Sequence, residues 1–249
     1  PNSRWYSGAG IYRPVDLFIA DKQHVLMNGV RIRTLSLDPA VVEIEVKTTG
    51  AGAVSVCIEK EGKALAEGRA DSDGKHTFRL TVQNAQPWTP ETPVLYTCRV
   101  RYAQDEWVDS FGFRTIGCTA EEGFTLNGKR VILRGACIHH DNGILGARCY
   151  AEAEERKIRL LKEYGYNAIR SAHNPCSKAM LDACDRLGML VMDEYCDMWY
   201  IHKTMYDYAD YVQEWYERDI TDMIEKDFNH PCVVMYSLGN EVAETAQKR

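Results

Sequence analysis

The chain has 249 residues, of which 45% are hydrophobic and 27% are charged, with a formal net charge of −6. This composition is typical of a folded globular protein and excludes a disordered chain. The acidic balance and the lack of a basic run argue against a nucleic-acid partner. No apolar stretch is long enough to span a bilayer, and residues 1–5 lack the apolar core of a signal peptide. We therefore expect no membrane partner and no secretory targeting.

The nine cysteines form no CxxC pair and no cysteine–histidine ligand spacing, so they do not predict a metal site. Most lie in apolar runs, where a free cysteine behaves as a small hydrophobic residue. A disulfide between Cys57 and Cys98, which both fall on predicted strands, is the alternative. The number of remaining thiols favours a reducing compartment, and we expect a cytoplasmic protein.

Residues 1–15 are rich in aromatic residues, glycine and proline. They predict the last strand of a domain that precedes residue 1, followed by a linker. Residues 16–116 then show an alternation of apolar and polar positions, as in Val42–Val46 and Tyr96–Tyr102. This period of two is typical of half-buried antiparallel strands. About seven short strands over roughly 100 residues predict a β-sandwich. No titratable side chains converge there, so we expect a spacer.

From residue 117 to 249, short apolar runs alternate with helical patterns, which predicts a parallel sheet. Helices are predicted over Ala151–Tyr164, after the capping residue Ser177, and through Val212–Ile224. The buried strands are predicted at Val131–Leu133, Asn167–Arg170, Met189–Met192 and Cys232–Tyr236.

Each predicted strand of this second part leads into polar residues. They are His139–Asp141, His173–Asn174, Asp193–Glu194 and Asn240–Glu241. Because the carboxyl ends of parallel strands meet at one rim, where α/β barrels carry their chemistry, we expect these side chains to lie together. The alternative for Glu241 is that it only begins a following helix.

At these residues the chain resembles glycoside hydrolase family 2, and within it the β-galactosidases. Asn167–Pro175, followed by Val191–Glu194, resembles the family's first signature. Asn229–Glu241 resembles its acid/base signature, and Pro87–Glu91 and Phe111–Arg114 are similar to its immunoglobulin-like domain. The resemblance covers almost the whole chain.

The resemblance implies a jelly-roll sugar-binding domain, a sandwich and a TIM barrel, in that order. Residues 1–15 would be the tail of the jelly roll, 16–116 an immunoglobulin-like β-sandwich, and 117–249 the N-terminal half of a (β/α)8 barrel. The predicted fold class is therefore multi-domain β plus α/β, with an incomplete barrel. The family places its nucleophilic glutamate on a later strand. We therefore expect the nucleophile beyond residue 249 and expect the isolated chain to be inactive.

The resemblance also implies a retaining β-galactosidase that hydrolyses β-linked galactosides. Glu241 would be the acid/base catalyst, and Asn240 would bind the sugar 2-hydroxyl. His139 and His173 would contact ring hydroxyls, and Arg170 would orient the nucleophile.

Two further residues are predicted to bind substrate, each with a plain alternative. Asp141 could instead open a loop, and Trp199 could pack at the rim rather than stack on a sugar. Asp193 could pair internally with Arg134 or Arg170, since buried charges are usually paired.

Metal-dependent members of the family carry an acidic residue and a histidine soon after the Asp-Glu of the third strand. Residues 195–200 do not keep that pattern, so we expect no active-site magnesium and no other cofactor. Alternative functions are a β-glucuronidase, a β-mannosidase, or a non-catalytic fragment that binds carbohydrate or protein. The exposed barrel edges are expected either to be covered by formation of a homo-oligomer or to remain an aggregation risk.

Overall fold

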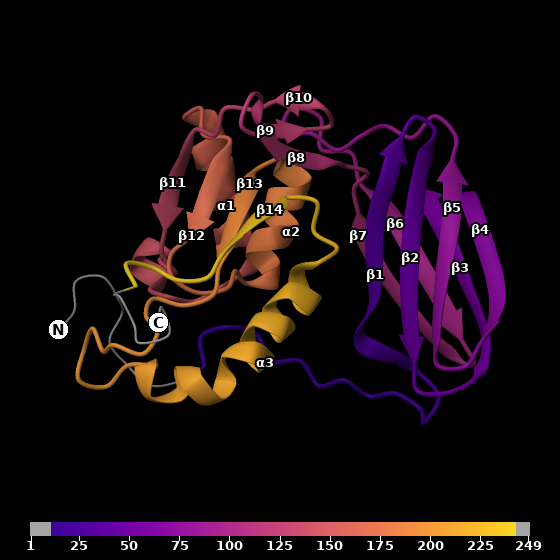
Figure 1. Cartoon of the computed structure of the whole chain (residues 1–249), viewed down its shortest axis with the longest axis horizontal. Coiled ribbons are helices and arrows are strands. Elements are labelled where there is room, and N and C mark those ends of the chain that lie inside the picture. The colour runs from indigo at the N-terminus through magenta and orange to yellow at the C-terminus, as the bar shows by residue number, and fades with distance from the viewer. Residues whose placement is uncertain (1–10, 243–249) are drawn as a thin grey trace. The chain divides into compact units, whose positions relative to one another are not determined.

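The computed structural model describes residues 11–242, so most of the predicted jelly-roll tail, residues 1–10, lies outside the described residues. The described chain forms two compact units. The sandwich unit comprises residues 15–132 and 228–231, and the βα unit comprises residues 11–14, 133–227 and 232–242 (Figure 1).

The sandwich unit contains two antiparallel sheets that match the alternation in the sequence. One has the order β1 (Val25–Leu37), β2 (Ala40–Thr48) and β5 (Lys75–Val82). The other has the order β4 (Lys63–Ser72), β3 (Gly52–Lys60), β6 (Tyr96–Tyr102) and β7 (Asp105–Phe111). Every second side chain of β2 is buried, which confirms the predicted sandwich.

A small three-stranded sheet follows, made of β8 (Ile116–Thr119), β9 (Gly123–Leu126) and β10 (Lys129–Arg130). Asn127, at the β9–β10 turn, holds this sheet to the sandwich. Its Oδ1 accepts from the Thr115 N–H at 2.9 Å, and its Nδ2 donates to the Trp88 carbonyl at 3.0 Å. By compactness the two units divide after residue 132. The domain boundary that the sequence predicts after residue 116 stays a prediction.

The βα unit is built on a four-stranded parallel sheet whose strands follow chain order. They are β11 (Gly135–Ile138), β12 (Ala168–Ser171), β13 (Leu190–Glu194) and β14 (Val233–Ser237). The helical segments are η1 (Gly143–Leu145), α1 (Ala151–Glu163), α2 (Lys178–Leu187) and α3 (Ala209–Asp227). Parallel neighbours in sequence order, joined by helices, are the arrangement of a singly wound barrel, so the predicted incomplete barrel is confirmed.

The predicted first strand was wrong in position. Ile132 is 67% exposed and Val131–Leu133 is not a strand; pairing begins at Gly135. A Cβ atom at Gly135 would lie 3.0 Å from the Ala168 carbonyl oxygen, so the backbones approach closely at this point. Asn167 marks the start of the pairing, because its Oδ1 accepts the Arg134 N–H at 2.7 Å.

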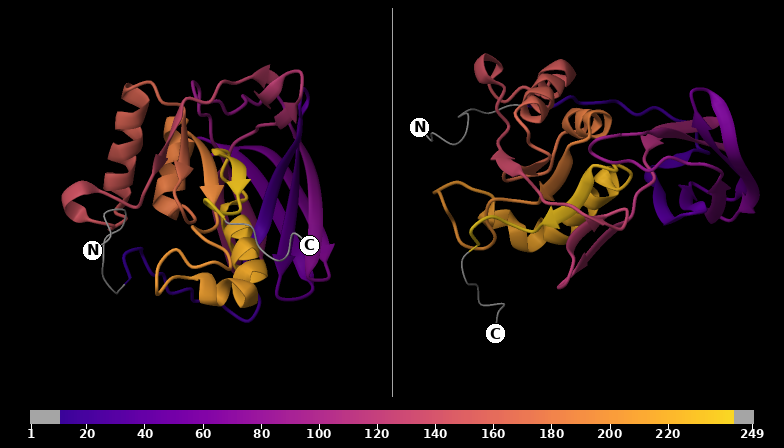
Figure 2. Two further views of the ribbon diagram at one scale, coloured as in Figure 1. Left: turned by 60° about the vertical axis from the view of Figure 1, so that its left-hand side comes forward. Right: turned by 90° about the horizontal axis from the view of Figure 1, so that it is seen from above.

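Helices α1 and α2 lie side by side along one face of the parallel sheet (Figure 2). Ser177 caps α2 as predicted, accepting the Met180 N–H at 3.2 Å, and Gly188 ends the helix in the left-handed conformation. The sheet's other face is open and apolar, with a hollow of about 240 Å³ lined by side chains such as Met192 and Met235.

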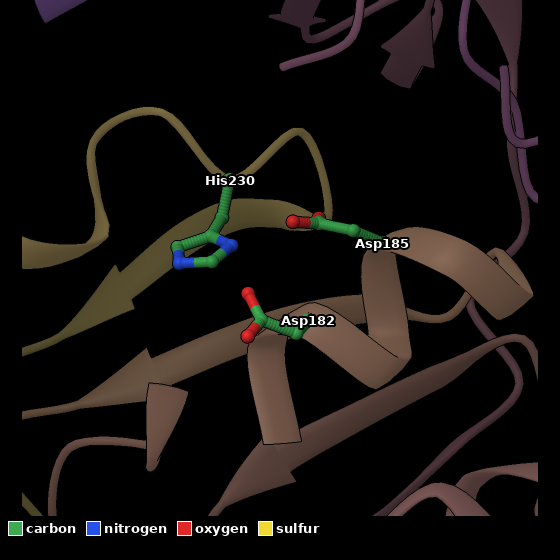
Figure 3. Close-up of side chains that lie close together, drawn as sticks. All are labelled: Asp182, Asp185 and His230. Atoms are coloured by element: carbon green, nitrogen blue, oxygen red, sulfur yellow. The ribbon is translucent and has the colours of Figure 1, made fainter. Parts of the chain in front are cut away.

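Two carboxylates of α2, Asp182 and Asp185, have structural roles (Figure 3). Asp185 is 1% exposed and accepts the Cys232 N–H at 2.9 Å, which ties the helix to the start of β14. Asp182 pairs with Lys178 at 2.8 Å. His230, the third residue labelled there, belongs to the sandwich unit.

All nine cysteines are free thiols, including Cys57 and Cys98, so the alternative disulfide is absent from the described residues. Within residues 11–242, no helix has both the length and the apolar character needed to cross a membrane.

Candidate active site

The centre of the site is Glu194, the last residue of β13, whose side chain is fully buried. Its Oε2 accepts from Arg170 Nε at 2.8 Å, from Arg170 Nη2 at 2.6 Å and from Ser237 Oγ at 2.6 Å. Its Oε1 lies 2.6 Å from His173 Nδ1. One carboxylate thus connects the carboxyl ends of β12, β13 and β14, and charge-assisted hydrogen bonds of this kind compensate its burial.

Asn240 is held by hydrogen bonds of both its side chain and its backbone. Its Oδ1 accepts from Arg170 Nη2 at 3.0 Å, and its Nδ2 donates to Asp197 Oδ1 at 2.8 Å. Its N–H donates to the Cys196 carbonyl at 3.2 Å, and its own carbonyl accepts from Lys203 Nζ at 2.7 Å. The side-chain amide is therefore fixed in orientation before any ligand arrives.

Glu241 follows Asn240 and points its carboxylate outward, with the side chain 76% exposed. Its φ of +47° lies in the left-handed region, which a residue other than glycine seldom adopts. The nearest cation is Lys203, whose Nζ lies 3.9 Å from Glu241 Oε2. A helix that follows Glu241 would lie in residues 243–249, which are outside the described residues, so the alternative that Glu241 begins a helix stays untested.

Three histidines lie at the ends of β11 and β12. The rings of His139 and His173 meet edge to face, with centroids 5.2 Å apart. The third histidine, His140, has its Nε2 3.1 Å from Arg13 Nη2. Burial and the Arg13 charge lower the pKa of His140 to about 4, so it is neutral near pH 7.

The two substrate-binding candidates with alternatives have other contacts in the structure. Asp141 is exposed, and its Oδ1 accepts the Gly143 N–H at 2.8 Å, as expected of a residue that opens a loop. Trp199 donates from Nε1 to the Leu238 carbonyl at 2.8 Å and packs partly buried beside Tyr195 and Cys196. Neither contact tests sugar binding by these residues, which stays a prediction.

Asp193 and Arg170 do not pair with each other. Asp193 Oδ1 accepts the Cys176 N–H at 2.8 Å, on the side of β13 opposite to Glu194, and Arg170 pairs with Glu194. Behind the sheet, Asp227 faces Asp193 and Lys226; burial raises the pKa of Asp227, Lys226 opposes that rise, and Asp193 adds to it.

Next to these residues is a cavity of about 770 Å³, within the βα unit. It is lined by His173, Asp197 and Lys203 on the side of the site, and by Tyr195, Tyr208 and residues of α3 on the other. The oxygen atoms of Asp197 and of the Asn240 carbonyl are the kind that hard cations prefer. Here the Lys203 ammonium satisfies both.

Sequence reasoning placed Glu194 at the rim without giving it a role, and it missed Asp197 and Lys203 as members of the site. Alternation of side chains across a strand predicts that only one residue of the Asp193–Glu194 pair faces the site, but it does not tell which one. Asp197 and Lys203 lie in the irregular segment between β13 and α3, where no periodicity indicates direction.

Comparison with known proteins agrees with this arrangement. Residues 119–249 match the model described as "Glycosyl hydrolases family 2, TIM barrel domain", and residues 27–114 match that described as "Glycosyl hydrolases family 2". The chain belongs to glycosyl hydrolase family 2.

Two curated relatives and one solved structure cover nearly all of the family 2 chain. A β-galactosidase of Bacteroides ovatus is 44% identical over 98% of this chain and 31% of its own length. A putative β-glucuronidase of Formosa agariphila is 35% identical over 97% of this chain and 24% of its own length.

The crystal structure of a family 2 member from Bacteroides cellulosilyticus has a TM-score of 0.93 at 40% identity, over 98% of this chain and 34% of that one. The chain therefore spans about a third or less of the length of these three relatives.

Proposed function

We propose that the full-length protein containing this chain is a retaining β-glycosidase, with β-galactosides as its substrates. The observation that carries the proposal is the end of β14, where Asn240, fixed by Arg170 and Asp197, immediately precedes the outward carboxylate of Glu241. The 44% identity to a β-galactosidase supports the choice of sugar.

In this proposal Glu241 gives a proton to the leaving oxygen and later takes one from water. Asn240 offers its remaining hydrogen-bonding capacity to the sugar 2-hydroxyl, and His139 and His173 offer theirs to ring hydroxyls. Rigid placement of these groups lowers the activation barrier, because the reacting groups are already in position when the substrate is bound.

A retaining mechanism also needs a second carboxylate about 5–5.5 Å from the first, to attack the anomeric carbon. The buried carboxylates near Asn240 are already engaged: Glu194 by Arg170, His173 and Ser237, and Asp197 by Lys203 and Asn240. We therefore propose that the nucleophile lies outside residues 1–249 and that Arg170 helps to orient it.

The test uses the full-length protein and the 1–249 polypeptide side by side. Chromogenic β-galactoside, β-glucuronide and β-mannoside are supplied to each, and we expect the galactoside to be turned over by the longer protein alone. The Glu241→Gln variant of the longer protein should lose about 10²–10⁴-fold in rate, the usual contribution of general acid–base catalysis. Wild-type turnover by that variant, or equal turnover by the 1–249 polypeptide, contradicts the proposal.

A β-glucuronidase is the second candidate, because a relative with 35% identity carries that name. A glucuronide adds a carboxylate to the sugar, which a protein binds with a cation. Lys203 and Arg170 are each already paired with carboxylates in the structure, which favours the neutral galactoside. A preference for the glucuronide in the substrate panel would reverse this choice.

Three expectations from the sequence remain proposals. The nine free thiols support a reducing, cytoplasmic location. The apolar hollow on the open face of the sheet supports coverage by further chain or by a second copy, and hence a homo-oligomer. The net charge of −6 supports the absence of a nucleic-acid partner.

A further inference from the structure

Lys203, in the segment between β13 and α3, presents a cation to the end of β14. Its side chain is 23% exposed. Its Nζ donates to Asp197 Oδ1 at 2.9 Å and to the Asn240 carbonyl at 2.7 Å, and lies 3.9 Å from Glu241 Oε2. One ammonium group is therefore surrounded by oxygen atoms from two separate segments of the βα unit.

The backbone around Lys203 is fixed by Asp207. The Asp207 carboxylate accepts the N–H groups of Lys203 at 2.7 Å, Thr204 at 2.9 Å and Ala209 at 3.0 Å. Burial raises the pKa of Asp207, but these backbone hydrogen bonds outweigh it and hold the pKa below its ordinary value. Asp207 is thus ionised at neutral pH, and Lys203 starts from an ordered position.

The segment that Lys203 contacts needs such support. Glu241 has a left-handed backbone conformation, and conformations of this kind persist only when the surroundings hold them. Gly239 is equally confined, since a Cβ atom there would lie 2.8 Å from Trp199 Nε1. Between them, Asn240 is bound by Lys203 at its carbonyl and by Asp197 at its amide.

We propose that Lys203 is a positioning residue for the glycosidase reaction, which with Asp197 fixes Asn240 and so places Glu241 for proton transfer. The inference rests on the proposed acid/base role of Glu241. Lys203 itself is assigned no proton transfer and no contact with the reacting bond; it acts through the two residues at the end of β14.

A positioning role has a kinetic signature that a general structural role lacks. Protonation by an acid matters most when the leaving group is a poor one, and matters little when the leaving group departs readily as an anion. A misplaced acid therefore lowers kcat/KM for phenyl glycosides far more than for dinitrophenyl glycosides. A variant that is merely less folded loses activity equally on both.

The experiment compares three variants of the full-length protein on dinitrophenyl, nitrophenyl and phenyl glycosides of the sugar that it hydrolyses. For Lys203→Met we expect about 10–100-fold loss of kcat/KM on the phenyl glycoside, part of the usual general-acid contribution, and little loss on the dinitrophenyl glycoside. Lys203→Arg keeps a cation and should recover most of the loss. Lys162→Met is the matched control, because Lys162 Nζ also donates to a carbonyl, that of Gly188, at 3.0 Å.

Equal loss on all three glycosides, or no loss, would overturn the inference. Glu241→Gln in the same series separates the two proposals: if it hydrolyses the phenyl glycoside like the wild type, the proposed function fails, whatever Lys203 does. A crystal structure of full-length Lys203→Met gives a test without turnover. We expect the Asn240–Glu241 segment to shift while β14 stays in place, and an unchanged segment overturns the inference.

Discussion

Replacing Glu194 by glutamine tests the claim that this buried carboxylate holds the site together. The substitution keeps the shape of the side chain but removes its charge, so that Arg170 and His173 lose their anionic partner. Removing one partner of a buried ion pair costs about 3–5 kcal/mol. Because the Arg170 side chain is 27% exposed and water can solvate it in part, we expect the lower end, about 3 kcal/mol.

The assay is thermal unfolding of the full-length protein, following the transition of the barrel. For a domain of this size, each kcal/mol corresponds to about 2–4 °C, so the melting temperature should fall by about 6–12 °C. Glu155→Gln is the matched control. It also removes a glutamate–arginine contact, with Arg186 at 2.8 Å, but both side chains are exposed. An exposed pair contributes about 0–1 kcal/mol.

The reasoning is refuted if the two variants melt at the same temperature. That result would mean that the buried carboxylate gains no more from its partners than a surface one does, and that its burial is not compensated by the contacts described. A fall confined to Glu194→Gln, with Glu155→Gln close to the wild type, supports Glu194 as the centre of the site.

Three further predictions follow from single contacts or groups. Gly239→Ala should lower kcat without abolishing folding, because the added methyl group meets Trp199 Nε1 at 2.8 Å. Combining Gly239→Ala with Trp199→Phe, which removes that nitrogen, should recover part of the lost kcat. For Asp227, burial raises the folded pKa from 3.8 to about 7, so the folded state binds the proton more tightly and wild-type stability should fall as pH rises through that window. Asp227→Asn should flatten this dependence in denaturant titrations across the window, and an unchanged slope would contradict the burial argument. Prolonged dialysis against a chelator should leave glycosidase activity intact, because the Lys203 ammonium satisfies the oxygen atoms of Asp197 and Asn240; activity restored only by magnesium would contradict this.

The elements were largely predictable because their signals are local. The period of two in Val42–Val46 reports burial on alternate sides of a strand, and β2 has that pattern. Ser177 and Gly188 marked the ends of α2 through hydrogen-bonding and conformational preferences of single residues. The first barrel strand was misplaced because Val131–Leu133 is apolar without forming a strand of the parallel sheet, and the close approach at Gly135 involves a neighbouring strand.

The sequence by itself determined the order of the elements, the rim where polar strand ends meet, and Asn240–Glu241 as its most informative pair. Only the tertiary structure decided that Glu194 rather than Asp193 faces the site, and that Lys203 meets the end of β14. The reason is distance along the chain: the contacts of Arg170 with Glu194 and Asn240 join residues 24 and 70 positions apart. Which partner a charged side chain finds across such separations depends on how strands register and loops return, and no local pattern encodes that choice.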